Sequence, residues 1–591
     1  MRTVRLRVDE LQNGNPGELK MIGQNPGGRL RIWAMAVVLC AAALISVVAR
    51  TDDRSLKYDV VIRHGTVLDG TGRARFVADV GIRGDRIATI GDIVDRAAIT
   101  IDAAGFMVAP GFIDMRSNSE YSRLVDGHGP SFSLQGVTTE IYGESHSMGP
   151  LGGKQGPPSV PPGVTANWKT LGEFLEVLEK RGTSVNFGSY VGSGTVRALV
   201  VGYEDRPATA AEVDQMREAV KNAMAEGAFG LSSGLSYAPN IYMNTDELIA
   251  LAKEAAAVGG IYATHIRTVN GRDPKAITEA ITIGERAGLA VHIAHLNSVA
   301  STSAAKFIAI IREAQHRGVK VTANCYPYTW GITGLSEYLP TWAQSGGTEK
   351  MLSRLRDPEQ RRRIARGFRT EEPFYLTSWD RVRLGVNDPA INGKLVSKVA
   401  EARHQSGDDT YMDIVLEQHG HGTLIDRNNE EGTLREVMKE PYVAVGTDGS
   451  AVDLLHMDRL RDESLVFPLL HPRHLGTFPR WLGRYARDYK LMTWEEGVRR
   501  MTSLAAETLG LKNRGTLRVG NFADIVVFDP KRLIDEATYS DPNHYAKGVR
   551  FVLVNGEFVV TDGKMTDALP GRALRGPGYR RATPEVGSQV R

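Results

Sequence analysis

Short apolar runs alternate with amphipathic segments along most of the chain. Two of these runs, Ile261–Thr264 and Leu289–Ala294, are followed directly by histidines, His265 and His295. The apolar residues of the segment between them recur at helical spacing on one face: Ile277, Ala280, Ile281 and Gly284. This pattern predicts a strand–helix–strand unit. Because parallel strands joined by a helix expose their C-terminal ends together, we expect the two imidazoles to lie close in space.

Paired histidines at strand ends are typical of a site for a borderline metal such as zinc. A single histidine at a strand end is more often a polar residue whose hydrogen bonds the protein satisfies. Two histidines at equivalent ends of consecutive strands favour metal binding, but this unit alone leaves both interpretations open.

Six further apolar runs have the length of parallel strands, which makes eight in all. They are Val108–Asp114, Val137–Tyr142, Phe187–Val191, Ala228–Ser232, Ile261–His265, Val291–His295, Val319–Cys325 and Val443–Asp448. Helical patterns cover residues 211–227, 246–260 and 304–318, and Asn244 with Glu247 predicts a capping box before the second of these. Eight strands with helical crossovers predict an α/β fold, a (β/α)8 TIM-like barrel with its chemistry at the C-terminal strand ends.

The segments on either side of the predicted barrel have a different sequence pattern from the barrel itself. Glycine-punctuated short strands at residues 55–106 and again at 513–567 predict a small β-sandwich domain built from both ends of the mature chain. The barrel is then assigned to residues 107–512. An insertion at about 332–425 includes a charged stretch, residues 349–372, that predicts a solvated helical segment. Residues 568–591 are rich in Gly, Pro and Arg and predict a poorly ordered tail.

The N-terminal 54 residues have the character of a leader. Residues 1–32 show no periodicity, and Trp33–Ala49 is a continuous apolar run of 17 residues preceded by Arg29 and Arg31. This pattern is typical of an export signal, with a cleavage point after Ala49. A run of this length also reaches the lower limit for spanning a bilayer, so an uncleaved membrane anchor stays open. We therefore expect an exported bacterial protein, either periplasmic or anchored in the membrane through residues 33–49.

Composition excludes several classes of protein. The 591 residues include 72 basic and 69 acidic side chains, a net charge of +3, which gives nucleic-acid binding no electrostatic support. The two cysteines, Cys40 and Cys325, exclude a disulfide framework and any multi-cysteine zinc site. Nothing in the sequence indicates an oligomeric state.

Asp448, at the end of the eighth predicted strand, adds a carboxylate to the same edge. By itself it would be interpreted as a turn cap before Gly449. The chain, however, carries an ordered set of motifs: VAPGFID, GVTTE, GLSSGLSY, ATHIR, IAHL, GTDG, HPRHLGTFPR and RGTLRVGNFADIVVFDP. Together they resemble the amidohydrolase superfamily, specifically its N-acyl-D-amino-acid deacylase (D-aminoacylase) branch, from about Tyr58 to about Gly563.

This resemblance implies a zinc-dependent hydrolase that acts on the amide bonds of small D-amino acid derivatives. It implies zinc ligation by His265 and His295 and a general acid/base role for Asp448. The third ligand of the family lies in the loop after the second strand, which here reads YGESHSMGP and has no cysteine. Glu144 is the best candidate in that loop, and His146 is a poorer one.

Two positions are implied to contact substrate. Tyr237, in GLSSGLSY, and Arg473, in HPR, match family positions of that kind, and a guanidinium can bind a carboxylate with two parallel hydrogen bonds. The alternative for Arg473 is a structural ion pair.

The chain departs from the family at two places. PGFID is normally followed by a His-x-His pair, but here the residues are Met115-Arg116-Ser117-Asn118. Asn297 stands where the family has a lysine after IAHL. A guanidinium has no lone pair for a metal, so we expect one zinc ion and loss of the second site. Arg116, if it points inward, would exclude a second cation or bind a substrate carboxylate; the alternative is an outward ion pair with Glu120.

These observations predict a one-zinc amidohydrolase in which Asp448 takes a proton from the attacking water and returns it to the leaving amine. Two other functions stay open. A hydantoinase-like enzyme would hydrolyse a cyclic amide, although the HPR and GTFPR segments favour the acylase branch. A binding protein that retained the barrel and lost catalysis is the other alternative, because His-x-His is missing.

Overall fold

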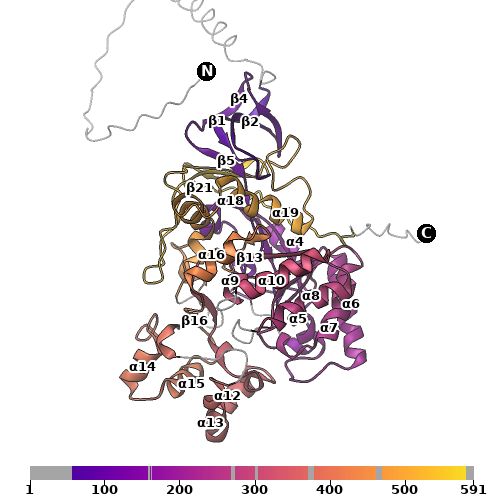
Figure 1. The fold of residues 1–591 in the computed structure, drawn as a ribbon, viewed down its shortest axis with the longest axis vertical. Coiled ribbons are helices and arrows are strands. Elements are labelled where there is room, and N and C mark those ends of the chain that lie inside the picture. The colour runs from indigo at the N-terminus through magenta and orange to yellow at the C-terminus, as the bar shows by residue number, and fades with distance from the viewer. Residues whose placement is uncertain are drawn as a thin grey trace, which may run out of the picture. The chain divides into compact units, whose positions relative to one another are not determined.

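The computed structural model describes residues 56–156, 160–161, 163–267, 273–299, 304–370, 378–460 and 469–580. The predicted export segment Trp33–Ala49 lies outside these ranges. Among the residues that are described, no helix combines the length and the apolar character that crossing a membrane requires. From Lys57 onward the chain forms one unit, whose elements are labelled in Figure 1.

Both ends of this unit contribute to one nine-stranded sheet. The N-terminal strands are β1 (Tyr58–Val67), β2 (Phe76–Arg83), β3 (Arg86–Gly91), β4 (Ala97–Asp102) and β5 (Met107–Pro110). The C-terminal strands are β18 (Ile525–Phe528), β19 (Val549–Val554), β20 (Glu557–Thr561) and β21 (Lys564–Met565). β5 and β18 are antiparallel neighbours, so the two segments predicted to pair do meet in this sheet.

The parallel strands form two hydrogen-bonded sets. One has the order β6 (Phe112–Asp114), β7 (Val137–Tyr142) and β8 (Asn186–Ser189). The other has the order β9 (Val191–Gly192), β10 (Gly230–Gly234), β11 (Ile261–His265), β12 (Val291–Ile293), β13 (Val321–Cys325) and β17 (Val443–Val445). Backbone contacts join their outer edges: Tyr190 N–H donates to Tyr142 O at 2.9 Å, and Asp448 N–H donates to Arg116 O at 2.9 Å. The fold is therefore α/β with parallel sheets.

The first predicted strand, Val108–Asp114, is wrong as one element. The chain changes partners at Gly111: Gly111 N–H donates to Asp524 O at 2.8 Å, and Phe112 N–H donates to Gly136 O at 3.0 Å. A Cβ atom at Gly111 would lie 2.1 Å from Thr138 Oγ1. Only glycine permits this close approach, so the residue marks the passage from the antiparallel to the parallel sheets.

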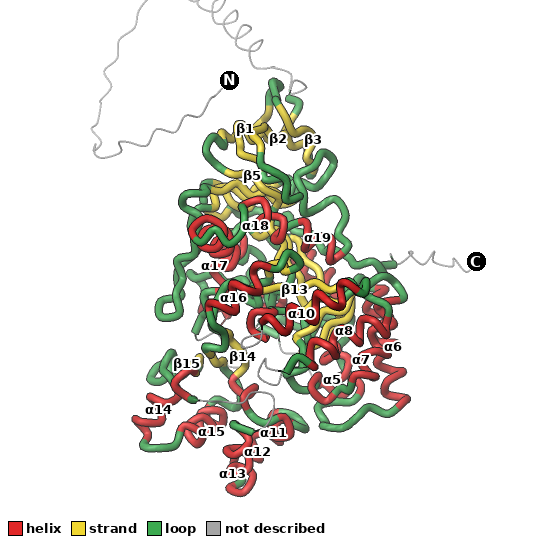
Figure 2. Tube along the Cα trace, viewed as in Figure 1, coloured by secondary structure: helices red, strands yellow, loops and turns green. Residues whose placement is uncertain are grey.

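Helices follow most of the parallel strands and lie outside them in Figure 2. The longer ones are α4 (Leu171–Arg181), α5 (Ser193–Val200), α6 (Ala210–Ala225), α7 (Thr245–Ala256), α8 (Lys275–Ala287), α10 (Ala304–His316), α16 (Glu431–Lys439) and α18 (Trp494–Met501). The predicted capping box of α7 is confirmed, because Asn244 Oδ1 accepts a hydrogen bond from Glu247 N–H and Glu247 Oε2 accepts one from Asn244 N–H. The predicted apolar face of α8 is buried.

Shorter helical segments fill the connections of this unit. They are α2 (Glu120–Val125), α3 (Pro130–Ser133), η2 (Gly153–Gln155), η3 (Asn240–Tyr242), α9 (Leu296–Val299), η6 (Met457–Leu460), α17 (Arg473–Arg480), the π-helix η7 (Trp481–Asp488) and α19 (Ser503–Leu509).

The predicted insertion is a lobe with its own small sheet and apolar core. Its elements are β14 (Gly331–Gly334), η4 (Leu335–Tyr338), α11 (Thr341–Gln344), α12 (Thr348–Arg356), α13 (Pro358–Gly367), η5 (Trp379–Arg381), β15 (Val382–Gly385), α14 (Val396–Arg403), α15 (Gly407–Glu417) and β16 (Thr423–Asp426). The charged stretch forms α12 and α13, but Leu352, Leu355 and Ile364 are buried in the lobe core. The stretch is thus amphipathic and only half solvated.

The prediction of a poorly ordered tail is wrong for residues 568–580. This segment runs past the N-terminal ends of β8 and β10. Leu574 N–H donates to Phe187 O at 2.6 Å, Phe187 N–H donates to Arg572 O at 3.1 Å, and Gly576 N–H donates to Gly227 O at 2.8 Å. The Gly and Pro residues that suggested disorder instead allow close backbone contact, since a Cβ at Gly576 would lie 2.1 Å from Ala228 O.

Candidate metal centre

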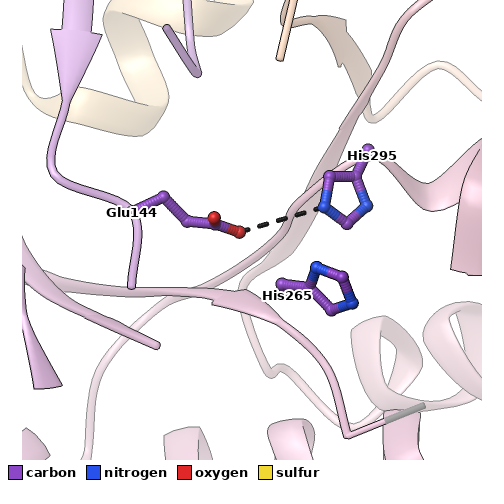
Figure 3. Close-up of side chains that lie close together, drawn as sticks. All are labelled: Glu144, His265 and His295. Atoms are coloured by element: carbon purple, nitrogen blue, oxygen red, sulfur yellow. Dashed lines mark ion pairs between the residues drawn. The ribbon is translucent and has the colours of Figure 1, made fainter. Parts of the chain in front are cut away.

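Three side chains meet at the C-terminal ends of the parallel strands. His265 is the last residue of β11, His295 follows β12 by two residues, and Glu144 follows β7 by two residues. One ligand atom from each lies within 4.8 Å of the others, and Figure 3 shows the carboxylate of Glu144 directed at the imidazole of His295. The predicted neighbourhood of the two histidines is confirmed, and the loop after the second strand contributes the glutamate.

Burial keeps both imidazoles neutral. Their ring centres are 4.4 Å apart and the rings are nearly perpendicular, at 82°. Burial, with a contribution from the nearby charge of Arg116, lowers the pKa of His265 to about 3. Burial also lowers the pKa of His295 well below its usual value, and His265 and two arginines act in the same direction. Neutral imidazoles offer the lone pairs that a metal needs.

These donors fit a zinc ion. His295 Nε2 lies 3.9 Å from Glu144 Oε1, and neither Glu144 Oε1 nor His295 Nδ1 has a hydrogen-bond partner among the described residues. Unpartnered buried polar atoms are costly unless a ligand satisfies them. Two imidazoles and one carboxylate match the three protein ligands of an open catalytic zinc site.

Asn324 positions His295 and was not anticipated from the sequence. The His295 backbone lies in the left-handed region, with φ +32°, and its N–H donates to Asn324 Oδ1 at 2.7 Å. Asn324 Nδ2 lies 2.8 Å from His292 Nε2. The amide thus links two histidines that flank the end of β12. A buried asparagine next to the seventh predicted strand end was the only signal available.

Arg116 points into the site and pairs with two acidic side chains. Its guanidinium contacts the carboxylates of Glu144 and Asp448, and the residue is 7% exposed. Burial disfavours the charged form of Arg116. The negative charge of Glu144 and its hydrogen bond with Arg116 outweigh this effect and raise the pKa of Arg116. The alternative pair with Glu120 is not what the structure has; Glu120 Oε1 accepts a hydrogen bond from Gly143 N–H at 2.8 Å.

Asp448 lies between two guanidinium groups. Arg473 Nη1 donates to Asp448 Oδ2 at 2.7 Å, while Arg116 and Asn118 Nδ2, the latter at 3.2 Å, contact Asp448 Oδ1. The residue is 7% exposed and its φ of +52° places it in the left-handed region. Asp448 therefore does more than cap a turn, because its carboxylate is directed toward the same space as Glu144.

Asp114 ties the first and last parallel strands together, another role that sequence reasoning missed. It accepts hydrogen bonds from Arg116 N–H at 3.1 Å, from Thr447 N–H at 2.9 Å and from the Thr447 hydroxyl at 2.5 Å. Its burial raises its pKa to about 7. One carboxylate thus fixes the backbone on which Arg116 and Asp448 stand. Asp114 is the last residue of the motif PGFID, but its position at a strand end did not indicate which residues it would contact.

The two predicted substrate contacts border the same space. The Tyr237 ring packs edge-on against the His265 ring, with centres 4.8 Å apart. Arg473 is 4% exposed, and its guanidinium lies 5.0 Å from the centre of the Tyr326 ring. Burial lowers the pKa of Arg473 to about 10. Arg473 is held by the ion pair with Asp448, so the structural ion pair named as the alternative is present.

His146, the poorer candidate for the third ligand, and the described cysteine, Cys325, both lie outside the cluster. His146 is exposed, and its Nδ1 lies 3.0 Å from Ser145 Oγ. Cys325 is buried at the end of β13, and burial raises the pKa of its thiol. Among the described residues, the only group of three or more His, Cys, Asp or Glu side chains close enough to hold a metal is Glu144, His265 and His295.

Comparison with known proteins adds a consistent set of relatives. A profile described as Amidohydrolase family matches residues 467–560. A D-aminoacylase from Alcaligenes xylosoxydans xylosoxydans is 33% identical over 529 residues, which cover 88% of this chain and 98% of the relative. An N-acyl-D-glutamate deacylase from the same organism is 30% identical over 539 residues, 90% of this chain and 99% of the relative.

Solved structures give the same picture. A D-aminoacylase studied for its binuclear metal center, with one-metal activation and second-metal attenuation, matches 88% of this chain and 100% of its own, with a TM-score of 0.72 and 30% identity. An N-acyl-D-glutamate deacylase from Bordetella bronchiseptica, complexed with zinc and a phosphonate inhibitor, has a TM-score of 0.71 and 28% identity over the same shares. A D-hydantoinase reaches a TM-score of 0.50 at 16% identity over 88% of this chain and 100% of its own, a likeness of fold alone.

Proposed function

Because the chain belongs to the amidohydrolase family, in its D-aminoacylase branch, we propose that it hydrolyses the amide bond of N-acyl-D-amino acids to a D-amino acid and a carboxylate. The observation that carries this proposal is the cluster of Glu144, His265 and His295 beside Asp448 at the strand ends. The hydantoinase-like alternative is more distant, since that likeness extends to the fold only.

The strand contacts support a closed (β/α)8 barrel with the cluster at its mouth. β6 and β17 would close the ring through the Asp448–Arg116 backbone hydrogen bond, and the nine-stranded sheet would form the accessory β-sandwich. In such a barrel the C-terminal strand ends form the catalytic face. The inserted lobe follows the C-terminal end of β13, which supports a position for the lobe beside the entrance for the substrate.

Glu144, His265 and His295 would hold one zinc ion. When bound, such an ion supplies Lewis-acid activation of water and of the amide carbonyl. Asp448 accepts the proton of the attacking water and delivers it to the departing amine nitrogen. Arg116 and Arg473 keep that carboxylate in place, because each contacts one of its oxygens. Tyr237, against His265, helps to orient the substrate.

Arg116 supports the assignment of a single ion. Its cationic guanidinium sits between the carboxylates of Glu144 and Asp448, two groups that would otherwise be free to share a second metal. A second cation would be repelled by several kcal/mol at a few ångströms in a partly dehydrated site. Elemental analysis after dialysis should therefore find close to one zinc per chain. Two zinc ions per chain would contradict the proposal that Arg116 excludes a second cation.

A substrate screen tests the function itself. Purified protein with added zinc should hydrolyse N-acetyl-D-amino acids and leave the L-enantiomers intact, and a chelator should abolish the activity. Hydrolysis of hydantoins in place of the linear amides would transfer the assignment to the cyclic-amide enzymes. A protein that holds no metal and hydrolyses neither class would be the catalytically degenerate binding protein.

A further inference from the structure

The loop that carries Glu144 contains a strained turn directly after this residue. Ser145 has a φ of +66°, in the left-handed region, and His146 N–H donates to Glu144 O at 2.7 Å across it. These features describe a γ-turn of positive φ, which is rare and strained. A residue other than glycine keeps such a conformation only where its surroundings hold it there. The contacts of Ser145 therefore determine how Glu144 is presented.

A chain of hydrogen bonds holds the side chain of Ser145. Asn240 Nδ2 donates to Ser145 Oγ at 2.9 Å, and the Ser193 hydroxyl donates to Asn240 Oδ1. Because the serine oxygen accepts from Asn240, its own hydrogen is available to His146 Nδ1, which lies 3.0 Å away. Ser145, Asn240 and Ser193 are all buried. The turn is thus held from η3 and from the start of α5, two elements that follow it much later in the chain.

Three glycines leave room for the backbone of Ser145. A Cβ at Gly192 would lie 2.4 Å from Ser145 O, and a Cβ at Gly194 would lie 2.8 Å from the same atom. A Cβ at Gly234 would lie 2.6 Å from Ser145 Cβ. Gly194 N–H also donates to Ser145 O at 2.9 Å. Gly234 ends β10 and is the register partner of His265 in β11, so the turn packs against the strand next to a metal ligand.

The residue before Glu144 is restrained as well. The Ser232 hydroxyl donates to Gly143 O, and Gly143 N–H donates to Glu120 Oε1 at 2.8 Å. Glu144 therefore stands between two residues that the fold holds in place. Its carboxylate is the one directed at the imidazole of His295 in Figure 3. Restraint of the backbone on both sides limits the directions in which this carboxylate can point before a metal binds.

We propose that Ser145 and Asn240 are positioning residues for the metal site. Their hydrogen bond holds the strained turn in the conformation that presents the Glu144 carboxylate to a zinc ion. This inference rests on the proposed metal-dependent function, and neither residue takes part in the chemical step. Groups that orient a metal ligand without touching the metal typically change the metal affinity by about 10- to 100-fold when they are substituted.

The test measures the zinc affinity of the full-length protein by competition with a chromophoric chelator. Asn240→Ala and Ser145→Ala should each weaken zinc binding by about 10- to 100-fold, because both remove the hydrogen bond that holds the turn. Ser145→Gly removes the same hydrogen bond, but glycine adopts a positive φ without strain and keeps the turn. Its zinc affinity should therefore be about fivefold or more tighter than that of Ser145→Ala.

Asn555→Ala is the matched control. Asn555 also has a left-handed backbone, with φ +49°, and is buried with a hydrogen-bonded side chain. It lies between β19 and β20 and contacts Asn186 at the start of β8, whereas the metal ligands lie at the opposite ends of the parallel strands. Asn555→Ala should lower the stability of the metal-free protein in urea and keep the zinc affinity within about twofold of wild type.

Two results would overturn the inference: wild-type zinc affinity in Ser145→Ala and Asn240→Ala, or equal losses in Ser145→Ala and Ser145→Gly. An equal loss of zinc affinity in Asn555→Ala would do the same, since it would show a general effect of destabilisation. If wild type binds zinc and hydrolyses N-acetyl-D-amino acids while the variants bind zinc equally well, the inference fails and the deacylase function stands. A wild type that binds no zinc would remove the metal centre and the inference together.

Discussion

Asp448 is held by contacts that fix its orientation without blocking proton transfer. Arg473 and Arg116 each contact one oxygen of the Asp448 carboxylate. Asp114 accepts hydrogen bonds from the backbone N–H groups of Thr447, which precedes Asp448, and of Arg116. A carboxylate restrained in this way loses little entropy when it accepts a proton from water. The arrangement predicts that Asp448 is separable from the metal ligands by substitution.

Asp448→Asn should retain zinc and lose nearly all turnover. The amide preserves the size and the contacts with Arg473 but cannot accept a proton, so kcat should fall by about 10²- to 10⁴-fold. Elemental analysis and steady-state kinetics on the same preparation check both halves. His265→Ala is the contrasting variant, since it should lose the metal as well. Wild-type turnover in Asp448→Asn would exclude the proton-transfer role.

Among the secondary-structure elements, the junction of β5 and β6 depends most on one residue. Gly111 lies where the chain leaves β18 for β7, and the space beside it is filled by Thr138, whose Oγ1 would be 2.1 Å from a Cβ and whose Cγ2 would be 2.3 Å away. The Thr138 side chain belongs to β7, so a larger residue at Gly111 would separate β6 from β7.

Gly111→Ala should therefore destabilise the protein by about 1–3 kcal/mol, the usual cost of overpacking a buried position. Urea denaturation followed by circular dichroism measures the change. Gly432→Ala, in α16, is the matched control. Apart from its chain neighbours and the backbone of its own helix, no atom lies within 4 Å of its Cβ position, and alanine is the better helix former by up to about 1 kcal/mol. The two substitutions should thus have opposite signs, and a neutral Gly111→Ala would show that Thr138 can move aside.

Local patterns predicted the elements well, and long-range contacts explain what they missed. The period of α8 and the capping box of α7 are properties of neighbouring residues, and both are as predicted. The proximity of His265 and His295 followed from the rule that parallel strand ends meet, whereas Glu144 was indicated by the family resemblance. The sequence did not predict that Arg116 points inward, because this orientation depends on ion pairs with Glu144 and Asp448 together. Likewise, the tail near Leu574 is ordered only by strands far away in sequence.

The whole protein carries a sensitivity to acid in its buried histidines. Burial lowers the pKa of His292 and His474 to about 3. A histidine whose folded pKa lies below its unfolded value contributes stability above about pH 6.5 and loses it as the pH falls toward the folded value. Asp114 and Glu120 act in the opposite sense, because their pKa is raised to about 7. Among the described residues, five buried histidines have a lowered pKa and three carboxyl groups, Asp114, Glu120 and Glu337, have a raised one, so the effect of the histidines prevails.

We therefore expect the free energy of unfolding of the metal-free protein to fall by about 2–5 kcal/mol between pH 6.5 and 4.5. Each histidine whose effect is not offset by a carboxyl group with a raised pKa contributes about 1.4 kcal/mol per pH unit. Denaturant titrations across this range measure it. His292→Gln should reduce the slope, whereas His404→Asn, at an exposed position, should leave it unchanged. Stability that stays constant or rises in acid would contradict the assignment of the buried histidines as neutral.

Export of the protein is a separate expectation, which rests on the apolar run Trp33–Ala49 and the arginines before it. Fractionation of the native host should recover the protein from the periplasm or the membrane. A truncated form that begins near Arg50 should accumulate in the cytosol. Full-length protein in the cytosol of the native host would refute export.

The nine-stranded sheet has a consequence for how the protein is made. β5 ends at Pro110, and its partner β18 begins at Ile525, about 415 residues later. At a synthesis rate of about 5–20 residues per second, the edge of β5 waits roughly 20–80 seconds on the ribosome before its neighbour exists. The segment around Leu574 that contacts the starts of β8 and β10 emerges later still. The nascent chain thus exposes an unpaired strand edge during most of its translation. The yield of folded protein should therefore depend on chaperones that shield such edges.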